Sequence, residues 1–323
     1  MIFIKKHFVL ILFAIYLTIL TCGTKTKTDR HYSKEHRIRI IIYPGETAKS
    51  VADKLYENNI IRDRQTFLFW AKILGCDKKI KSGRYYFLPN TKIINALKIL
   101  TTGGENRALV IIPEGYTIKE IARLLFNEGI CAENDFIHEC SNKSLLNSLN
   151  IKASSAEGYL FPDSYDFIIP SDPKNIISIM VNRFWQVYQE IHNNKSLDTV
   201  LIIASLVEKE AKLDSERPII ASVFYNRLKN KMPLQSCATV QYVLPMHKEQ
   251  LSIEDTKINS PYNTYIHLGL PPTPICNPGK ASLIAAIKPA KTDYLYFAVN
   301  ANGAHFFSKT FSEHQKFLRR RKK

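Results

Sequence analysis

The sequence predicts an α+β protein with two folded units behind an N-terminal apolar segment. In the first half of the chain, β-branched runs alternate with helix signals, and in the second half amphipathic helices dominate. The length of 323 residues exceeds one ordinary domain. With 45% hydrophobic, 23% charged and 11% aromatic residues, the composition excludes a wholly disordered, collagen-like or polytopic membrane protein.

Residues 1–24 are predicted to be a signal or a membrane anchor. Two lysines and a histidine precede an apolar run over residues 8–20, which is the layout of a secretory signal. The run is short for a membrane-spanning helix, which needs about 20 apolar residues. An anchor, a cleaved signal and, because of Cys22, a lipoprotein signal therefore stay open. Residues 25–36, rich in Thr, Lys and His, are predicted to be a linker.

Residues 37–150 are predicted to contain a repeated unit. Residues 38–43 predict a strand, a Pro-Gly pair predicts a turn, and Thr47 begins a helix. The same order returns 70 residues later, where residues 110–112 predict a strand and Thr117 with Glu120 forms a capping box. Between the copies, we expect a strand within 81–89 and a helix that carries Ile93, Leu97 and Leu100. The paired helix positions, expected to face the core, are Val51 with Ile121, Ala52 with Ala122, Leu55 with Leu125, Tyr56 with Phe126 and Ile60 with Ile130.

Residues 151–317 are predicted to form a more helical unit, followed by a basic tail over 318–323. Asp172-Pro173 opens one helix, a second runs from about Asp198 through Lys212, and a third starts at Pro218. Residues 231–279 lose the helical pattern and hold seven prolines, which is typical of a functional surface. A hairpin is predicted from residues 294–299 and 303–308.

The second of these helices carries the candidate catalytic acid. Glu208 follows an apolar run, and the small residues Ala204 and Ser205 one turn before it would let a bulky ligand approach. An apolar wall raises the pKa of a carboxyl group, as a general acid for glycosidic cleavage requires. Two alternatives stay open: an exposed carboxylate paired with Lys212, and Glu210 as the acid.

Other parts of the chain suggest sugar binding and offer no cofactor site. Segments 157–165, 232–236 and 260–265 contain polar or tyrosine side chains suited to sugars, although loop packing is the alternative for the tyrosines. The chain has no CxxC pair, HExxH motif, phosphate-binding glycine loop or GxSxG elbow, so we expect no metal and no other cofactor. The net charge of +16 favours an anionic partner or reflects a solvated lysine-rich surface; without an RNA-binding or zinc-finger signature, nucleic acid is not expected.

Over residues 37–317 the chain resembles the YceG-like family, the endolytic murein transglycosylases of bacterial membranes. Several long motifs occur in the family's order, which makes the resemblance specific. They lie at 112–122, 157–162, 204–210, 222–228, 260–265, 269–272, 277–279, 294–297 and 305–308.

The resemblance implies a single-pass protein of the inner (plasma) membrane. A LysM-like peptidoglycan-binding region of βαα type would occupy residues 37–150, and a mixed α+β catalytic domain at 151–317 would lie outside the cytoplasm. The implied reaction cleaves the β-1,4 bond between N-acetylmuramic acid and N-acetylglucosamine within nascent glycan strands, without water. It leaves 1,6-anhydro ends and stops strand growth, in concert with peptidoglycan synthases such as penicillin-binding proteins.

The resemblance also assigns roles to individual residues. Glu208 takes the position of the catalytic glutamate. Motif position implies that the substrate is bound by Gln235, Thr239, Asn263 and Tyr265, with Glu157 and Tyr159 as second candidates.

One motif departs from the family pattern. The family commonly reads Gln-Ser-Asp-Pro-Thr-Val where this chain reads Gln235-Ser-Cys-Ala-Thr-Val240, so an acid and a turn-setting proline are missing. The loss is the best support for the alternative function, a non-catalytic peptidoglycan-binding scaffold at the membrane.

Overall fold

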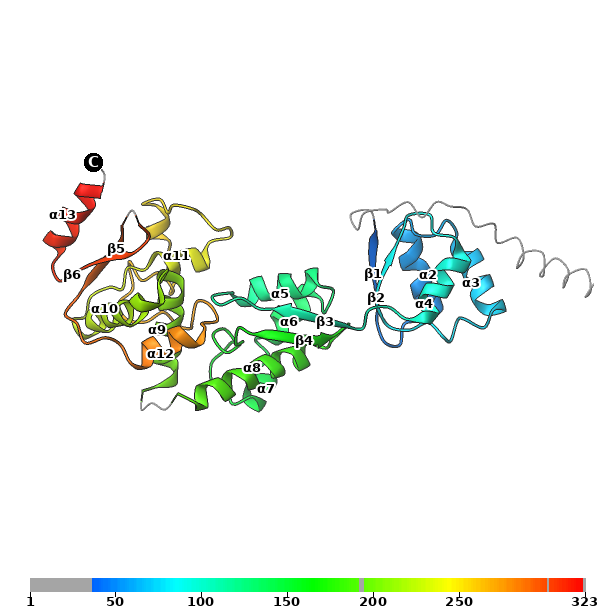
Figure 1. Cartoon of the computed structure of the whole chain (residues 1–323), viewed down its shortest axis with the longest axis horizontal. Coiled ribbons are helices and arrows are strands. Elements are labelled where there is room, and N and C mark those ends of the chain that lie inside the picture. Colours follow the sequence, from blue (N-terminus) through cyan, green and yellow to red (C-terminus); the bar gives the residue numbers. More distant parts are fainter. Residues whose placement is uncertain (1–36, 192–194, 301, 322–323) are drawn as a thin grey trace, which may run out of the picture.

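The computed structural model describes residues 37–191, 195–300 and 302–321, and it confirms the mixed α+β fold class. The predicted signal or anchor and the linker lie outside these residues. Within the described ranges, every helix is too short or too polar to cross a bilayer. Figure 1 shows a first module at one end of the molecule and the more helical part at the other.

The first module is a two-stranded antiparallel sheet covered by helices. Its strands pair with Ile40 opposite Tyr85. Thr47 caps the first helix, since its side chain accepts a hydrogen bond from the Ser50 backbone N–H at 3.2 Å. Its elements are β1 (Ile38–Ile42), α2 (Ala48–Glu57), α3 (Arg64–Ile73), β2 (Gly83–Phe87) and α4 (Ile93–Thr102).

The second module also begins with a strand and two helices, but a third helix comes before its second strand. Its two strands are antiparallel, with Leu109 opposite Asp166. The capping box of Thr117 and Glu120 is confirmed, since each side chain accepts a hydrogen bond from the other residue's backbone N–H. An ion pair of 3.3 Å between Arg84 and Glu128 links the two modules. The elements are β3 (Arg107–Ile111), α5 (Ile118–Asn127), α6 (Glu133–Glu139), α7 (Lys143–Ser148) and β4 (Ser164–Ile168).

The aligned helix positions of the two modules match in burial. The four pairs formed by Val51, Ala52, Leu55 and Ile60 with their partners 70 residues later are all fully buried. The fifth pair was expected in the core and is not: Tyr56 and Phe126 are 43% and 47% exposed. Each follows a buried leucine directly, which turns it about 100° away from the buried stripe.

The helical part of the chain shares one hydrophobic core with the second module, and this core runs from Ala108 to Ile287. The three predicted helices and the hairpin are confirmed. The second helix ends at Glu210, because Ala211 is already extended. Its residues 200–207 are all buried. The elements are α8 (Pro173–Gln189), α9 (Leu197–Glu210), η2 (Asp214–Glu216), α10 (Arg217–Lys229), α11 (Cys237–Val243), η3 (Asp255–Lys257), α12 (Lys280–Ile287), β5 (Tyr296–Val299), β6 (His305–Ser308) and α13 (Phe311–Arg321).

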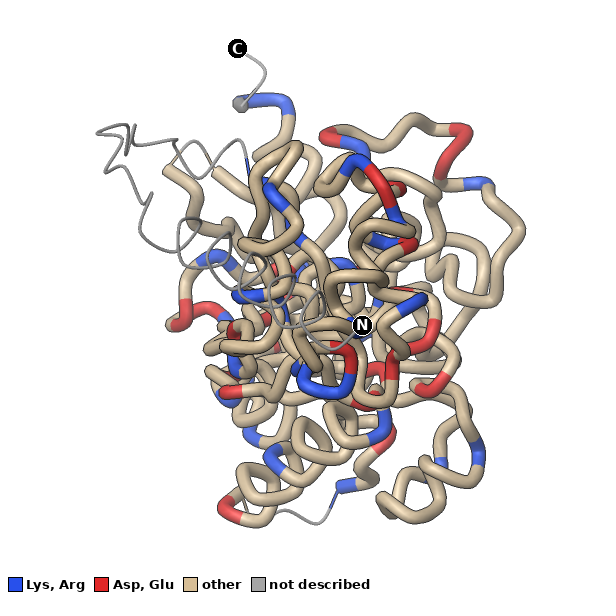
Figure 2. Tube along the Cα trace, turned by 90° about the vertical axis from the view of Figure 1, so that its right-hand side faces the viewer, with Lys and Arg blue, Asp and Glu red and all other residues tan. Residues whose placement is uncertain are grey.

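Residues 231–279 are irregular apart from α11 and η3, as the sequence predicts. They connect α10 to α12, and these two helices pack against each other and against α9. The irregular segment therefore starts and ends beside the helix that carries both candidate acids. Figure 2 shows basic and acidic residues interspersed along the described trace.

Candidate active site

Glu208 lies in the last turn of α9, and both of its carboxylate oxygens are engaged. Arg217 Nη1 donates to Oε1 at 3.0 Å, and the Gly279 backbone N–H donates to Oε2 at 2.9 Å. The side chain is only 6% exposed. The alternative of an exposed carboxylate paired with Lys212 is therefore wrong, because α9 ends before Lys212 and the paired cation is Arg217.

The loop before α12 packs against the small residues that precede Glu208. The Ser205 hydroxyl accepts a hydrogen bond from the Ile275 backbone N–H at 3.1 Å. The Cys276 thiol donates to the Ser205 carbonyl oxygen at 3.4 Å. The expectation that these small side chains would let a bulky ligand approach is wrong, because the loop before α12 occupies that space.

Arg217 connects three segments around Glu208. It opens α10, and its side chain is 10% exposed. Its Nε donates to Asp214 Oδ1 at 2.8 Å, and its Nη1 also donates to the Ser282 hydroxyl on α12. A guanidinium, instead of the expected apolar wall, thus faces Glu208.

A second carboxyl group, Glu114, approaches Glu208 from the loop between β3 and α5. A methyl group added to Gly279 would lie 1.8 Å from Glu114 Oε1, so this carboxyl rests directly on the Gly279 backbone. Burial first, and then the charge of Glu208, raise the pKa of Glu114. Glu114 was not among the predicted site residues, since the Pro-Glu-Gly-Tyr turn at 113–116 entered only as part of the family motif at 112–122. A signal for Glu114 was available in the sequence, since a turn with proline, glycine and glutamate follows the first strand of both modules, at 44–46 and at 113–115.

Glu210 points to the other side of α9. Residues two apart on a helix are turned by about 200°. The Ser236 hydroxyl donates to Glu210 Oε1 at 2.6 Å, just before α11. Burial raises the pKa of Glu210 above the usual range of a glutamate. Glu210 thus has the raised pKa that a general acid requires, although its contact is a serine hydroxyl and not the apolar wall expected around Glu208.

The irregular segment places polar side chains beside Glu210. Tyr265 Oη and Cys237 Sγ lie 3.0 Å apart. Burial first, and then Cys237 and Glu210, raise the pKa of Tyr265, so these groups are within electrostatic reach of one another. Gln235 is exposed, and its Oε1 accepts a hydrogen bond from Arg227 at 3.2 Å. Since Cys237 is also exposed, this side of α9 opens to solvent.

Two of the predicted substrate-binding residues, Thr239 and Asn263, are fully buried. The Thr239 hydroxyl donates to the Ser236 carbonyl oxygen at 2.8 Å. The Asn263 Nδ2 donates to the Thr256 and Ile258 carbonyl oxygens, and its Oδ1 accepts from the Tyr265 backbone N–H at 3.0 Å. Their contacts hold the loops that carry Ser236 and Tyr265.

The structure places Glu157 and Tyr159 in the interior. Glu157 accepts hydrogen bonds from the Ile118 backbone N–H, from Asn277 Nδ2 at 2.9 Å and from the Tyr242 hydroxyl at 3.2 Å. Burial raises the pKa of Glu157 to about 8. The Tyr159 ring is buried and packs 5.2 Å from the Phe184 ring. Glu157 thus links the second module to the loop before α12, and Tyr159 packs against α8.

Histidine and cysteine side chains in the described ranges do not gather into a metal-binding group. Three or more His, Cys, Asp or Glu side chains never cluster there in a way that could hold a metal ion. His305 instead forms a buried pair with Glu216, with 2.6 Å between Nδ1 and Oε2. The five cysteines of the described part are free thiols.

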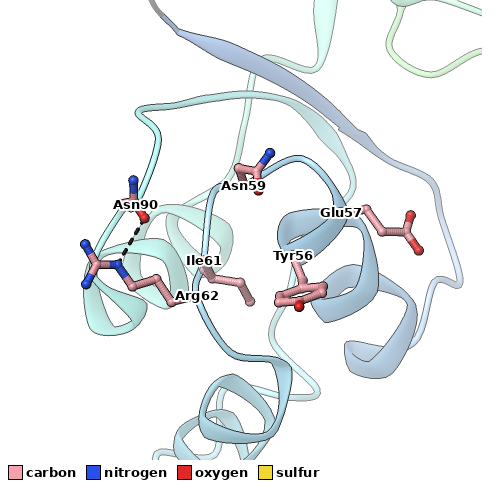
Figure 3. A pocket seen from close by; sticks show the side chains of 6 residues that line it. All are labelled: Tyr56, Glu57, Asn59, Ile61, Arg62 and Asn90. Atoms are coloured by element: carbon pink, nitrogen blue, oxygen red, sulfur yellow. Dashed lines mark hydrogen bonds between the residues drawn. The ribbon is translucent and has the colours of Figure 1, made fainter.

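A separate hollow of about 380 Å³ lies on the first module, between the end of α2 and the loop after β2. Arg62 Nε donates to Asn90 Oδ1 at 3.0 Å on one side of it (Figure 3). The half-exposed Tyr56 ring forms part of its wall. The lining residues are Tyr56, Glu57, Asn59, Ile61, Arg62 and Asn90.

Comparisons with known proteins agree with the resemblance. The model of the YceG-like family matches residues 40–320. The chain is 36% identical over 301 residues to the endolytic murein transglycosylase of Bacillus subtilis (strain 168), covering 86% of this chain and 83% of that protein. It is 31% identical to the protein of the same name from Streptococcus pneumoniae serotype 2, covering 86% of this chain and 57% of that longer protein. The crystal structure of a yceG-like protein from Listeria monocytogenes matches with a TM-score of 0.58 and 32% identity, covering 87% of this chain and 99% of that one.

Proposed function

The chain belongs to the YceG-like family, and we propose that it is an endolytic murein transglycosylase, a lyase of bacterial peptidoglycan. Its substrate is the β-1,4 bond between N-acetylmuramic acid and N-acetylglucosamine within nascent glycan strands. Relatives of this name match most of the chain. The observation that carries the proposal is a carboxyl group of raised pKa at the end of α9, beside an open, tyrosine-containing surface.

The geometry favours Glu210 over Glu208 as the proton donor. A general acid has to hold a proton and direct it at the substrate. Both oxygens of Glu208 accept hydrogen bonds from the protein, whereas burial raises the pKa of Glu210, which favours the protonated form that a general acid needs. We therefore assign proton donation to Glu210. Glu208, which motif position suggests, becomes a positioning residue that joins α9 to α10 and α12.

A single carboxyl group is sufficient for this reaction. Glu210 donates its proton to the bridging oxygen as the bond from that oxygen to C1 of N-acetylmuramic acid breaks. The C6 hydroxyl of the same sugar attacks C1 and forms the 1,6-anhydro bond, and its proton passes to the Glu210 carboxylate. The acid is thereby regenerated, and no water is consumed.

The groups next to Glu210 are placed to hold the sugar. The Gln235 amide can donate and accept hydrogen bonds, and the Tyr265 ring offers an apolar face to a pyranose. Thr239 and Asn263 are buried beneath this surface, where they form hydrogen bonds with the backbone of Ser236 and of Tyr265. Cys237, where the family commonly has aspartate, contributes a thiol that pairs with Tyr265.

The segments before the catalytic domain attach the protein to the membrane and to peptidoglycan. Residues 1–24 anchor the protein in the inner (plasma) membrane and residues 25–36 are a linker. Residues 37–150 bind peptidoglycan as LysM-like modules, and residues 151–317 form the catalytic domain on the extracytoplasmic side. The hollow beside Tyr56 offers arginine and asparagine groups for a saccharide. Peptidoglycan synthases are the expected partners, since the reaction ends the strands that they extend.

The assignment is tested by incubating uncrosslinked glycan strands with wild type, Glu210→Gln and Glu208→Gln, and by measuring 1,6-anhydro products by mass spectrometry. Circular dichroism and thermal unfolding verify that each variant is folded. We expect Glu210→Gln to lose at least about 100-fold in rate, because general acid catalysis contributes 10²–10⁴-fold. Folded Glu208→Gln should retain activity.

Two outcomes would contradict the proposal. If folded Glu208→Gln is inactive while Glu210→Gln is active, Glu208 is the proton donor. If the wild type binds glycan strands but releases no anhydro product, the chain is a non-catalytic wall-binding scaffold.

A further inference from the structure

The outer face of α3 in the first module is strongly apolar. Its inner face packs into the module core, where Phe67 and Ala71 are fully buried. Four large apolar residues are exposed on the outer side of the helix, at its flank or just after its end, and we call them the α3 patch. Their exposed fractions are 58% for Phe69, 38% for Trp70, 58% for Ile73 and 41% for Leu74.

Helical spacing makes the α3 patch contiguous. Phe69 and Ile73, and likewise Trp70 and Leu74, are four residues apart and therefore neighbours on the surface. The Phe69 and Trp70 rings meet edge to face, with their centroids 5.7 Å apart. An exposed cluster of this size is a usual sign of an interaction surface.

Basic side chains adjoin the α3 patch. Lys72 lies in the same helical turn, and Lys78 and Lys79 follow in the turn after the helix; all three are exposed. Within the described residues, none of the three forms a salt bridge. Aromatic and aliphatic side chains next to unpaired lysines match the chemistry of an anionic lipid surface, where the rings lie at headgroup level and the cations meet phosphates.

The position of α3 agrees with this occupant. Figure 1 shows α3 on the side of the first module that faces away from the helical part of the protein. In the sequence, residues 21–36 are all that separate the apolar run from this module. A chain of that length spans at most about 55 Å, so an inserted apolar run would keep the module close to the bilayer.

We propose that the α3 patch binds the surface of the anionic membrane and holds the first module against it. The inference rests on the membrane location given under the proposed function. This contact would orient the molecule on the membrane. The helix α9, which carries Glu210, lies in the part of the molecule away from α3, so the cleavage site is held away from the lipid (Figure 1).

The test uses tryptophan fluorescence, because the chain has only two tryptophans, Trp70 and Trp185. The full chain is reconstituted into phosphatidylcholine and phosphatidylglycerol vesicles that contain brominated lipid, which quenches indole at short range. The Trp70→Phe variant reports Trp185 alone, and Trp185 packs against Tyr159. We expect quenching in the wild type and its loss in Trp70→Phe.

The lysine contribution is tested with Lys72→Gln/Lys78→Gln/Lys79→Gln. This variant should lose most of the Trp70 quenching, since each lysine near an anionic surface contributes roughly a factor of five in partitioning. A control of equal charge carries Lys229→Gln and Lys231→Gln on the helical part, together with Lys212→Gln, and should keep the quenching.

The readouts separate this inference from the membrane location. Flotation of the chain with vesicles reports membrane attachment as such. If the chain floats and Trp70 is not quenched, the α3 patch does not touch lipid and the inference is overturned. Protection of Trp70 from aqueous acrylamide without bromolipid quenching would also overturn it, because a protein surface then covers the patch. If the chain does not float, the membrane location itself fails.

Discussion

Glu208 and Glu210 are separated by one lysine, yet their carboxyl groups lie on opposite sides of α9. Glu208 accepts hydrogen bonds from Arg217 and Gly279 inside the protein. Glu210 accepts one from Ser236, beside an exposed surface. In the last turn of α9, Glu208 thus connects α9 to α10 and to the residue before α12, whereas Glu210 has a raised pKa that suits proton transfer.

Replacing Arg217 by glutamine should destabilise the fold. The Glu208 side chain, which is only 6% exposed, would lose its ion-pair partner. Breaking a buried pair in this way costs about 3 kcal/mol in free energy of unfolding. Urea titration measures the loss. Arg64→Gln is the matched control, because its pair with Asp53 is exposed and contributes under about 1 kcal/mol.

Adding a methyl group at Gly279 should force Glu114 out of place. The new Cβ would lie 1.8 Å from Glu114 Oε1, so we expect Gly279→Ala to cost about 1–3 kcal/mol. In the Glu114→Ala background the carboxyl is gone and the same change should cost little. A double-mutant cycle on unfolding free energies gives the coupling. Additive effects would show that the two residues are not in contact.

The buried Glu157 should make stability depend on pH. Its folded pKa of about 8 lies above the unfolded value near 4.5, so its contribution is fully present below pH 4.5 and is lost as the pH rises toward 8. The loss amounts to roughly 5 kcal/mol at most. Glu157→Gln can keep the Asn277 and Tyr242 contacts and should flatten this dependence. The unfolding midpoints of wild type and Glu157→Gln are measured at pH 5 and pH 8. An equal change in midpoint between the two pH values for both proteins would refute the prediction.

Alkylation of Cys237 should block activity. Among the described cysteines Cys237 is exposed, whereas Cys131, Cys140 and Cys276 are buried. A maleimide on Cys237 would occupy the surface beside Tyr265 and Glu210, where we place the sugar. Burial raises the pKa of this thiol, so labelling is carried out at mildly alkaline pH. Cys237→Ser should be active and resist the reagent. Full activity of the labelled wild type would exclude this surface as the glycan site.

Much of the local structure follows from the pattern of the sequence. The helix capped by Thr117 and Glu120 forms as expected, because a capping box depends on residues three apart. The hairpin of β5 and β6 follows from its turn and its alternating residues. The helix α3 was not predicted. Its apolar residues lie on two faces, which hides the single-stripe signal that the other helices show.

The site itself was predicted only in part. The sequence points to both glutamates of α9 and to a substrate surface of Gln235 and Tyr265, which stays a prediction, and it offers Glu157 as a second substrate-binding candidate. Glu157 is instead buried against Ile118 and Asn277, which lie 39 and 120 residues away in the chain. Such contacts leave no local periodicity from which to read them.

From its residues alone, the chain reveals its family, its repeated strand and helix units, and an apolar helix that ends in two acids, because these features depend on short-range spacing and motif order. Tertiary structure alone decides which acid is engaged by an arginine and which is engaged by a serine next to the exposed residues Gln235 and Cys237. The reason is that the protonation and reach of a carboxyl group depend on the neighbours that distant segments place around it, here Arg217, Gly279 and Ser236.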